Sequence, residues 1–286
     1  MSNISVVIPV YNEEKGGAKG IDQVKHVLEN IPGQWEIITV NDGSTDKTEE
    51  VLKQFSYAKI INHNSNRGYG AAIKTGIKSA IYENILIIDA DNTYPADRIP
   101  ELLDNMEHHD MVVGARNGKT VHHSLLKRLV KWPIHMLANY LADYKIPDLN
   151  SGLRVFKKDL AKKYFRLLPN GFSLTSNITL AFLSDGYRVK YVPIDYYKRA
   201  GKSKVRPFSD AINYLTLVLR MILFYNPLKI FIPLAGVFFF ASIMSLAYDI
   251  FVIDNVGDKS IMLFIGFVQV AILGLLADLI NRRGSE

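Results

Sequence analysis

The chain of 286 residues contains no cysteine, so it forms no disulfide and offers no thiolate ligand to a metal. Disulfides are common in secreted domains, and their exclusion agrees with a protein part that faces the cytosol. The first residues, MSNISVVIPV, also lack the basic segment and the cleavage site of a signal peptide. We therefore expect no cleaved signal and a first part that folds in a reducing compartment.

Two nucleotide-binding fingerprints are missing as well. No G-x-x-x-x-G-K-[ST] occurs, which excludes a P-loop, and the segment GYGAAI lacks the third glycine of G-x-G-x-x-G. That segment also follows the third expected strand, whereas the dinucleotide fingerprint follows the first. The seven histidines show no spacing typical of metal ligands. These absences argue against a dinucleotide-binding domain and against a histidine metal site.

The excess positive charge lies in one short segment. Residues 196–229 contain seven basic residues and one acidic residue, an excess equal to the formal charge of +6 of the whole chain. No basic stripe covers the remainder, so the chain does not have the charge pattern of a nucleic-acid-binding protein. A basic segment directly before an apolar run is attracted to anionic lipid by ~1 kcal/mol per Lys or Arg. The same charges can also bind phosphates of a substrate.

Two long apolar runs near the end of the chain, 230–251 and 261–280, predict two membrane-spanning helices. Each has the ~20 residues that cross the hydrocarbon core. A buried core helix is the alternative, but two such runs with a short linker favour a membrane hairpin. The apolar residues of 207–228 recur at helical spacing, which predicts an amphipathic helix at the membrane surface. We expect a globular domain over 1–206, this surface helix, and a hairpin over 229–286.

Basic residues predict the orientation of that hairpin. Lys229 precedes the first run and Arg282 and Arg283 follow the second, whereas the loop between them carries Asp254, Asp258 and only Lys259. Because basic residues are enriched on the cytoplasmic side, we expect both ends of the hairpin and the globular part in the cytoplasm. A two-helix anchor can also pack against copies of itself.

The first 116 residues alternate apolar runs with amphipathic helical patterns. The runs predict strands at 4–10, 35–41, 58–63, 84–90 and 110–115. The patterns between them predict helices at about 17–31, 46–56, 70–83 and 96–107. Such alternation is typical of an α/β, Rossmann-like fold with a mainly parallel sheet and helices on both faces. Ligands of these folds bind at the carboxyl ends of the strands.

Unusual residues follow every expected strand. Acid, amide, aromatic, glycine and arginine residues come after them in the segments PVYNEE (9–14), NDGSTD (41–46), NRGYG (66–70), DADNTYP (89–95) and GAR (114–116). Each segment alone is a weak signal, because turns and helix caps have similar compositions. Parallel strands, however, place all five at one edge of the sheet, which we call the rim.

The segment ILIIDADNTYP (85–95) places two carboxylates, Asp89 and Asp91, at the end of an apolar run. In an extended strand both would point to the same side. Two like charges at that distance repel unless a cation lies between them, and Mg²⁺ or Mn²⁺ with oxygen ligands is the usual solution. The alternative is that Asp91, Asn92 or Thr93 caps a helix that begins near Pro95. The shared placement of the five segments favours the metal.

The rim suits a nucleoside diphosphate. Tyr11 offers a flat face for a base, although it can instead pack on the following helix. Asp42 can accept hydrogen bonds from a base or a ribose, and Gly68 and Gly70 allow a backbone to come close to a ligand. Arg116 can add positive charge near the phosphates.

The segments VVIPVYNEE, VNDGSTDKT, NRGYGAAIKTGI and DADNTYP, in this order and spacing, resemble family-2 glycosyltransferases with the GT-A fold, over residues 4 to about 206. DLNSGLRVF (148–156) and VPIDYYKRAGKSK (192–204) resemble the branch of dolichyl-phosphate mannose synthases and bactoprenol glucosyltransferases. The resemblance implies metal-dependent transfer of a sugar, with inversion, from a nucleotide sugar to a dolichyl or undecaprenyl phosphate. It implies this activity at the cytoplasmic face of a membrane.

The resemblance also implies roles for individual residues. The positions implied to bind the nucleotide sugar are Pro9, Tyr11, Glu13, Val40, Asp42, Asn66, Gly68, Ala90 and Asp91. Asp89 and Asp91 would hold the metal and, with Arg116 and Arg199, form the catalytic set. The positions expected near the acceptor phosphate are Arg116, Lys127, Arg128, Lys131, Arg199, Lys202, Ser203 and Lys204. Thr93 departs from the pattern, because many relatives have there a glutamine that contacts the metal.

Two basic or polar segments keep a structural alternative. The segment 122–144, which holds Lys127, Arg128 and Lys131, can lie at the membrane surface or be an ordinary amphipathic helix packed on the sheet. Asp148, Ser151 and Arg154 can contact substrate or can hold a structural loop by hydrogen bonds.

The sequence also lacks an acid where one is needed for transfer to an alcohol. Such a transfer requires a general base, and residues 160–184 contain no Asp or Glu. A phosphate acceptor is already anionic at pH 7 and needs none. The pattern Q-x-x-R-W of processive polysaccharide synthases is also absent. The alternatives left open are a transferase with a lipid or glycan hydroxyl acceptor and a non-catalytic scaffold that binds nucleotide sugars.

Overall fold

The structure of the chain is a computed structural model. It describes residues 3–14, 16–116, 144–171, 173–197, 226–253 and 255–284, together with eight single residues between 136 and 224. The chain divides into two compact units, Met1–Tyr214 and Leu215–Glu286, and each is described here by itself.

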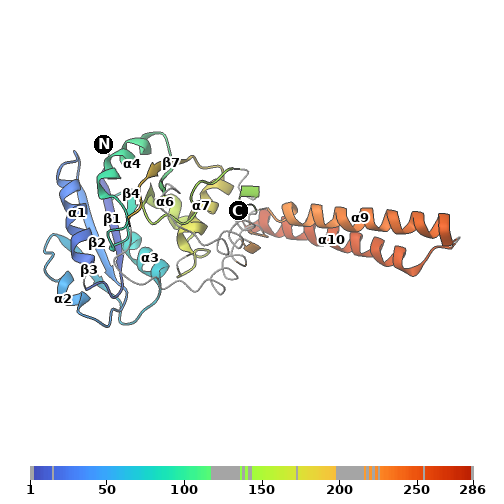
Figure 1. The fold of residues 1–286 in the computed structure, drawn as a ribbon, viewed down its shortest axis with the longest axis horizontal. Helices are drawn as coiled ribbons and strands as arrows, with labels where there is room; N and C mark the ends of the chain where they lie inside the picture. Colours follow the sequence, from blue (N-terminus) through green and yellow to red (C-terminus); the bar gives the residue numbers. More distant parts are fainter. Residues whose placement is uncertain are drawn as a thin grey trace. The chain divides into compact units, whose positions relative to one another are not determined.

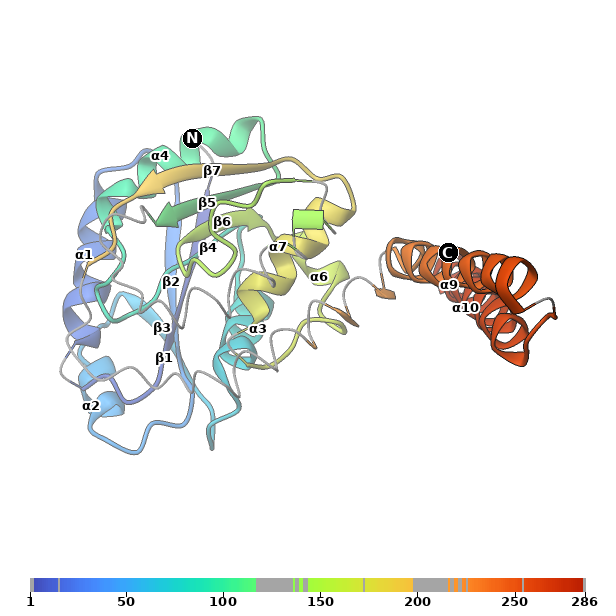
Figure 2. The ribbon, with the colours of Figure 1, turned by 45° about the vertical axis from the view of Figure 1, so that its right-hand side comes forward.

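The first unit is built on a seven-stranded sheet with the order β3-β2-β1-β4-β6-β5-β7 (Figure 2). The strands are β1 (Ile4–Val10), β2 (Trp35–Asn41), β3 (Ala58–Asn62), β4 (Asn84–Ile87), β5 (Met111–Arg116), β6 (Arg154–Lys157) and β7 (Val189–Ile194). All neighbours pair in parallel except β6, which is antiparallel to both β4 and β5. The predicted α/β fold with a mainly parallel sheet is therefore confirmed.

Helices cover the sheet on both faces. In chain order they are α1 (Gly17–Glu29), α2 (Thr48–Leu52), α3 (Tyr69–Ser79), η1 (Ala96–Arg98), α4 (Ile99–Asp104), η2 (Asn105–Glu107), α6 (Lys158–Lys163) and α7 (Leu174–Ser184). The core between the sheet and helices α1 and α4 contains Val6 and Ile8 of β1. Val7 points the other way, where it meets Gly76 of α3. Every residue of β1 is therefore buried, as expected for a parallel strand covered on two faces.

Several boundaries differ from the sequence prediction, and the second helix, expected at about 46–56, covers only Thr48–Leu52. The fourth strand ends at Ile87 and not near residue 90, so both aspartates lie beyond it. The third helix ends at Ser79, and the predicted helix over 96–107 is divided into η1, α4 and η2. The strands β6 and β7 were not predicted; β6 has only four residues, which leave little periodicity to detect.

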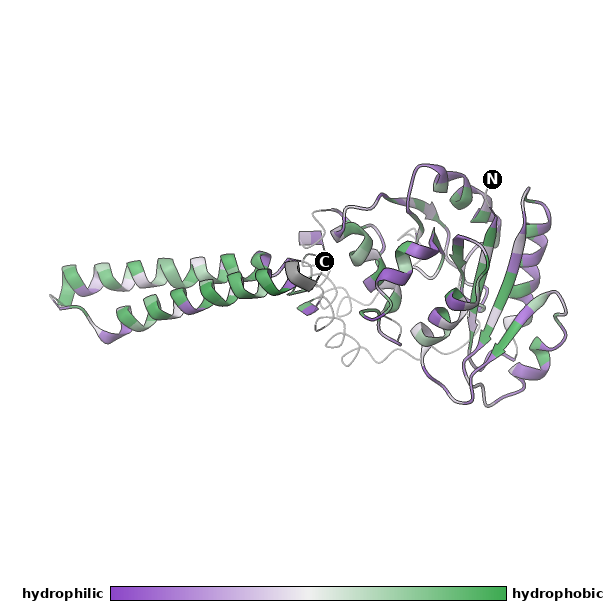
Figure 3. Ribbon diagram, turned by 180° about the vertical axis from the view of Figure 1, so that it is seen from behind, coloured by the Kyte–Doolittle hydropathy of each residue, from purple (hydrophilic) through white to green (hydrophobic). Residues whose placement is uncertain are grey.

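The second unit contains two helices that form a hairpin (Figure 1). Helix α9 (Leu228–Tyr248) continues into the π-helical turn η3 (Asp249–Ile253), and α10 (Asp258–Gly284) returns alongside it. Leu228–Ile253 and Asp258–Asn281 are long and apolar enough to cross a membrane, and Figure 3 shows apolar residues along both. The two predicted apolar helices are confirmed, whereas most of the predicted surface helix over 207–228 lies outside the described residues.

Polar contacts close the turn of the hairpin. The carboxylate of Asp249 accepts hydrogen bonds from the backbone N–H of Gly257 at 2.9 Å and from the hydroxyl of Ser260 at 2.5 Å. The hydroxyls of Ser260 and Ser245 lie 2.8 Å apart. These bonds satisfy the polar groups where the chain leaves α9 and enters α10.

Candidate functional site

The carboxyl ends of five strands meet at the rim. β1, β2, β3 and β4 are parallel, and β5 runs the same way because both it and β4 are antiparallel to β6. The chain runs outward from β1 to β3 and then returns to β4 on the other side of β1. The strand order thus reverses between β1 and β4, and open α/β sheets bind their ligands at such a switch point.

The loops after β1 and β2 are hydrogen-bonded to each other. The backbone N–H of Asn12 donates to the hydroxyl of Ser44 at 3.0 Å, and the N–H of Thr45 donates to Oδ1 of Asn12 at 2.8 Å. The N–H of Glu13 donates to the hydroxyl of Thr48 at 2.9 Å. The segment NDGSTD therefore fixes the loop that presents Tyr11, which is half-buried.

Asp42 holds the loop that follows β3. It is 2% exposed, and its Oδ1 accepts hydrogen bonds from the N–H of Arg67 at 3.0 Å and from Nδ1 of His63 at 2.7 Å. Its Oδ2 accepts one from the N–H of Gly68 at 2.8 Å. A carboxylate only accepts, so Nδ1 of His63 carries the hydrogen, and its Nε2 lies 3.0 Å from the hydroxyl of Thr75. The structure thus gives Asp42 a structural role beside its predicted contact with the nucleotide.

Gly68 and Gly70 allow a close approach, but to the chain itself. A Cβ on Gly68 would lie 2.4 Å from the carbonyl oxygen of Asn170, and one on Gly70 would lie 2.4 Å from that of Pro169. Gly68 also has a φ of 99°, which side chains rarely adopt. The segment 169–171 therefore lies against the two glycines, where the sequence analysis expected a ligand.

Asp89 lies on the loop after β4, between α3 and the start of β6. The hydroxyl of Tyr69 donates to Oδ1 of Asp89 at 2.8 Å. On another side, a Cβ on Gly152 would lie 2.5 Å from Oδ2 of Asp89. The N–H of Gly152 donates in turn to the hydroxyl oxygen of Tyr94 at 2.7 Å. The carboxylate therefore occupies a space that Tyr69 and Gly152 limit.

Asp91 belongs to a turn and not to an extended strand. Its Oδ1 accepts hydrogen bonds from the hydroxyl of Thr93 at 2.6 Å and from the N–H of Thr93 at 3.2 Å. Asn92 between them has a φ of 57°. The residue before the first turn of η1 is Pro95, with no capping side chain, so the helix-capping alternative fails. The premise that a strand aligns Asp89 and Asp91 is wrong, because β4 ends before them.

Burial and the charge of Asp89 act on the two neighbouring phenols. Burial raises the pKa of Tyr69 well above its usual value, and the charge and hydrogen bond of Asp89 raise it further. Burial and Asp89 also raise the pKa of Tyr94. Both phenols therefore keep their protons at neutral pH, and Tyr69 remains a donor to the carboxylate.

Arg116 forms a two-pronged ion pair with Asp148. Its Nε and Nη2 donate to the two carboxylate oxygens at 2.6 and 2.8 Å, and the guanidinium lies 5.3 Å from the centre of the Tyr196 ring. Burial raises the pKa of Asp148, but the hydrogen bonds and charge of Arg116 outweigh burial and lower it. The sequence analysis expected the positive charge of Arg116 to face substrate phosphates. In the structure the guanidinium is also paired with the carboxylate of Asp148.

Arg154 is fully buried, and within the described part of the chain its hydrogen bonds go to neutral oxygens. It donates to the carbonyl of Ser151 at 3.1 Å, to the carbonyl of Thr175 at 2.6 Å and to the hydroxyl of Thr179 at 2.8 Å. These bonds tie the segment DLNSGLR to α7. For Ser151 and Arg154 the structure favours the alternative of a structural loop.

The remaining predicted residues are placed as follows. Pro9 and Val40 are cross-strand partners at the ends of β1 and β2, Ala90 is buried between the two aspartates, and Asn66 is exposed. The predicted acceptor residues Lys127, Arg128, Lys131, Arg199, Lys202, Ser203 and Lys204 lie outside the described residues. Sequence reasoning missed His63, Tyr69, Tyr94 and Gly152, because their partners are distant in the chain.

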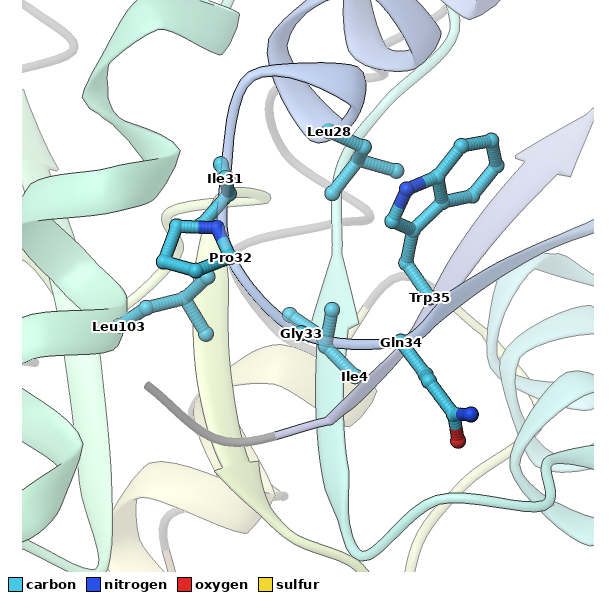
Figure 4. Close-up of a pocket in the computed structure, with 8 residues that line it drawn as sticks. All are labelled: Ile4, Leu28, Ile31, Pro32, Gly33, Gln34, Trp35 and Leu103. Carbon is cyan, nitrogen blue, oxygen red and sulfur yellow. The ribbon is translucent and has the colours of Figure 1, made fainter.

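A small apolar recess lies at the opposite edge of the sheet (Figure 4). It is lined by Ile4 and Trp35 at the amino ends of β1 and β2, together with Leu28 and Leu103. Within the described part of the chain, no group of three or more histidine or acidic side chains converges on a metal position. The rim, where the loops after five strands meet, is the candidate site.

Comparisons with known proteins show which family the chain resembles. The profile of the family described as glycosyl transferase family 2 matches residues 5–165, and that of the GtrB C-terminal hairpin matches residues 226–282. A dolichyl-phosphate hexose transferase from Haloferax volcanii is 27% identical, over 72% of this chain and 88% of its own. A dodecaprenyl-phosphate galacturonate synthase from Rhizobium johnstonii is 24% identical, over 98% of this chain and 90% of its own.

A solved structure shows the same fold. Glucosyl-3-phosphoglycerate synthase from Mycobacterium tuberculosis, in complex with Mn²⁺, uridine diphosphate and phosphoglyceric acid, superimposes with a TM-score of 0.60. It is 21% identical to this chain and covers 78% of each of the two chains. The likeness concerns the fold of the first unit and its sheet with helices on both faces.

Proposed function

This chain belongs to glycosyl transferase family 2, and from that membership we propose that it transfers a sugar from a nucleoside-diphosphate sugar to a polyprenyl phosphate. The acceptor class is supported by the names of the relatives from Haloferax volcanii and Rhizobium johnstonii. It is also supported by the hairpin of two apolar helices, since a polyprenyl phosphate stays in its bilayer. The observation that carries the proposal is the pair Asp89 and Asp91 at the switch point between β1 and β4.

The two aspartates fit a divalent ion such as Mg²⁺ or Mn²⁺. Carboxylate oxygens are the ligands that such ions prefer, and the lack of a Cβ on Gly152 avoids a clash with the carboxylate of Asp89. Two protein ligands are few, which suits an ion that takes its other ligands from substrate phosphates and water. When bound, the ion supplies positive charge that stabilises the departing diphosphate. Thr93 acts on this site through its hydrogen bond to Asp91 and takes the place of the relatives' glutamine.

The rim residues would bind and orient the donor. The loops after β1 and β2, which are hydrogen-bonded to each other, would present Tyr11, Glu13 and Asp42 to the base and ribose. Arg116 lies at the end of β5, where its guanidinium adds charge near the phosphates while Asp148 fixes its direction. We assign the acceptor phosphate to Arg116 and to the basic residues at 127–131 and 199–204, which bring two anionic substrates together.

The reaction needs no general base. A phosphate oxygen of the acceptor forms a bond to the anomeric carbon, and the bond from that carbon to the donor diphosphate breaks with its electron pair. The nucleoside diphosphate leaves, the configuration inverts, and no proton moves. Ser176, in the first turn of α7, is hydrogen-bonded to Asn150 beside the rim, and this turn contains no acidic residue. The absence of an acid from this turn supports an acceptor that needs no base.

The orientation of the hairpin follows from the basic residues at its ends. We propose that the first unit and both ends of the chain lie in the cytoplasm, with residues 255–257 on the other side. The natural absence of cysteine makes the test simple, because one introduced cysteine is the only thiol. In sealed cells an impermeant maleimide should label Asn255→Cys and should not label Glu50→Cys; the reverse pattern contradicts this orientation.

The donor and acceptor are tested together by incubating the purified chain with polyprenyl phosphate, Mn²⁺ and a panel of nucleoside-diphosphate sugars. Mass spectrometry of the lipid fraction should show a polyprenyl-phosphate sugar for at least one donor. Asp91→Asn should reduce its formation by about 100-fold or more, as expected for a lost metal ligand. Absence of a lipid product from every donor, or full activity of Asp91→Asn, would contradict the proposal.

A further inference from the structure

The hydroxyl of Tyr69 connects two parts of the rim that the sequence treats as separate motifs. We propose that Tyr69 is a positioning residue that fixes the metal-binding carboxylate Asp89 and couples it to the loop 66–70, which is held by Asp42. This inference rests on the proposed function, because it assumes that Asp89 binds the metal. Tyr69 itself contacts neither the metal nor the reacting atoms.

The first step of the connection is the anchoring of the loop 66–70. Asp42 accepts hydrogen bonds from the N–H groups of Arg67 and Gly68, and both of its oxygens are used. Gly68 is the residue directly before α3, and Tyr69 is the first residue of that helix. The backbone of Tyr69 is therefore placed by the same carboxylate that is predicted to contact the base or ribose.

The second step is the contact of Tyr69 with Asp89. The phenol donates to Oδ1 at 2.8 Å, and the residues are 20 positions apart in the chain. The bond is partly buried, and a hydrogen bond to a charged acceptor is stronger than one between neutral groups. This bond selects one orientation of the Asp89 side chain among those that its χ angles allow.

The third step is a barrier on the other side of Asp89. Gly152 comes so close that a Cβ would lie 2.5 Å from Oδ2 and 2.8 Å from Cγ of Asp89. Its own position is fixed, because its N–H donates to the hydroxyl oxygen of Tyr94 at 2.7 Å. The carboxylate can therefore move neither toward β6 without a clash nor away from α3 without losing the bond to Tyr69.

The consequence is a coupling between nucleotide and metal. A nucleotide that orders the loop at Asp42 also orders Tyr69, and thereby holds Asp89 in the orientation that binds the ion. Outer-shell partners of ligating carboxylates commonly contribute a factor of ~10–100 to metal affinity. Tyr69→Phe removes only the hydroxyl and keeps the ring, so it isolates this contribution.

The test is Mn²⁺ binding to the full chain in detergent, measured by electron paramagnetic resonance of the free ion, with and without added UDP or GDP. Tyr69→Phe should weaken Mn²⁺ binding by ~10–100-fold and should reduce the gain in affinity that the nucleotide gives. In the transfer assay it should raise the Mn²⁺ concentration needed for half-maximal rate, with the rate largely recovered at saturating Mn²⁺. A merely structural role would lower the rate at every Mn²⁺ concentration.

The chain offers a matched control and a second variant. The hydroxyl of Tyr57 donates to Oδ1 of Asp22 at 2.6 Å, away from the rim, so Tyr57→Phe removes the same kind of bond and should leave Mn²⁺ affinity unchanged. Gly152→Ala displaces Asp89 from the opposite side and should weaken Mn²⁺ binding by a similar factor. Thermal unfolding checks that each variant folds. If Tyr69→Phe does not fold, the Mn²⁺ affinity of Gly152→Ala tests the positioning of Asp89 instead.

The possible failures can be told apart. Unchanged Mn²⁺ affinity in Tyr69→Phe, with binding lost in Asp89→Asn, overturns the positioning role and leaves the proposed function standing. Unchanged Mn²⁺ affinity in both Asp89→Asn and Asp91→Asn overturns the metal site itself, and with it the proposed function.

Discussion

At the scale of single residues, the rim depends on side chains that hold other side chains. Asp42 holds a loop, Thr93 holds Asp91, and Asp148 holds Arg116. The sequence identified the carboxylates Asp89 and Asp91, because two acids after an apolar run are unusual. It could not identify their partners, because Tyr69 and Gly152 approach Asp89 only after the sheet has formed.

The pair Arg116 and Asp148 predicts a dependence of stability on pH. Asp148 is buried, and its pKa in the folded state lies below the value of about 3.9 in an unfolded chain. The pair therefore stabilises the fold above that pH, and this stabilisation is lost as the pH falls through the folded-state pKa. Asp148→Asn should lower the free energy of unfolding by about 1.5–3 kcal/mol at pH 7. Unfolding in detergent at pH 7 and pH 3.5 measures the difference, which should shrink at the lower pH.

A second ion pair provides the control for that measurement. Asp159 and Lys162 lie 3.5 Å apart on the surface of α6, and the Asp159 side chain is 71% exposed. Asp159→Asn should change stability by less than about 0.5 kcal/mol at either pH, because exposed pairs contribute little. Equal destabilisation of Asp148→Asn at both pH values would show that its effect comes from packing and not from charge.

At the scale of elements, hydrophobic periodicity predicted the strands β1 to β5 and the helices between them. It missed β6, whose four residues include the buried Arg154 and which enters the sheet in the opposite direction. The residues of a short strand do not show whether it runs parallel or antiparallel to its neighbours. Here β6 follows β5 after 37 residues, so the connection is too long to predict the direction of the strand. The periodicity also extended β4 too far, since Ile88 is buried like a strand residue although the ladder has ended.

The hairpin of α9 and α10 gives a prediction at the same scale. Gly274 packs against α9, where an added Cβ would lie 2.5 Å from Cβ of Phe231, whereas Gly236 has no neighbour within 4 Å of such a Cβ. Gly274→Ala should therefore push the helices apart and destabilise the hairpin by about 1–3 kcal/mol. Gly236→Ala should be neutral or slightly stabilising, because alanine favours a helix by about 1 kcal/mol.

Thermal unfolding of the two variants in detergent compares the same substitution in two environments. A lower midpoint for Gly274→Ala and an unchanged or higher midpoint for Gly236→Ala are expected. Equal midpoints would mean that the two helices do not pack through Gly274.

At the scale of the whole molecule, the chain has two compact units with different surfaces. The first unit carries carboxylates and Arg116 at the edge of a sheet, and the second contains two long apolar helices. The first suits a water-soluble donor and the second suits an acceptor that cannot leave a bilayer. The proposed transfer of sugar to a lipid phosphate draws on both units of the chain.

The acceptor group is the most direct test of that account. Purified chain is given a competent nucleotide sugar, Mn²⁺, and either a polyprenyl phosphate or the free polyprenol of the same length, and the lipid products are measured by mass spectrometry. A phosphate acceptor needs no base, so the polyprenyl phosphate should be glycosylated and the polyprenol should remain unmodified. Glycosylation of the polyprenol at a comparable rate would contradict the account, because transfer to an alcohol requires a general base and the proposed reaction uses none.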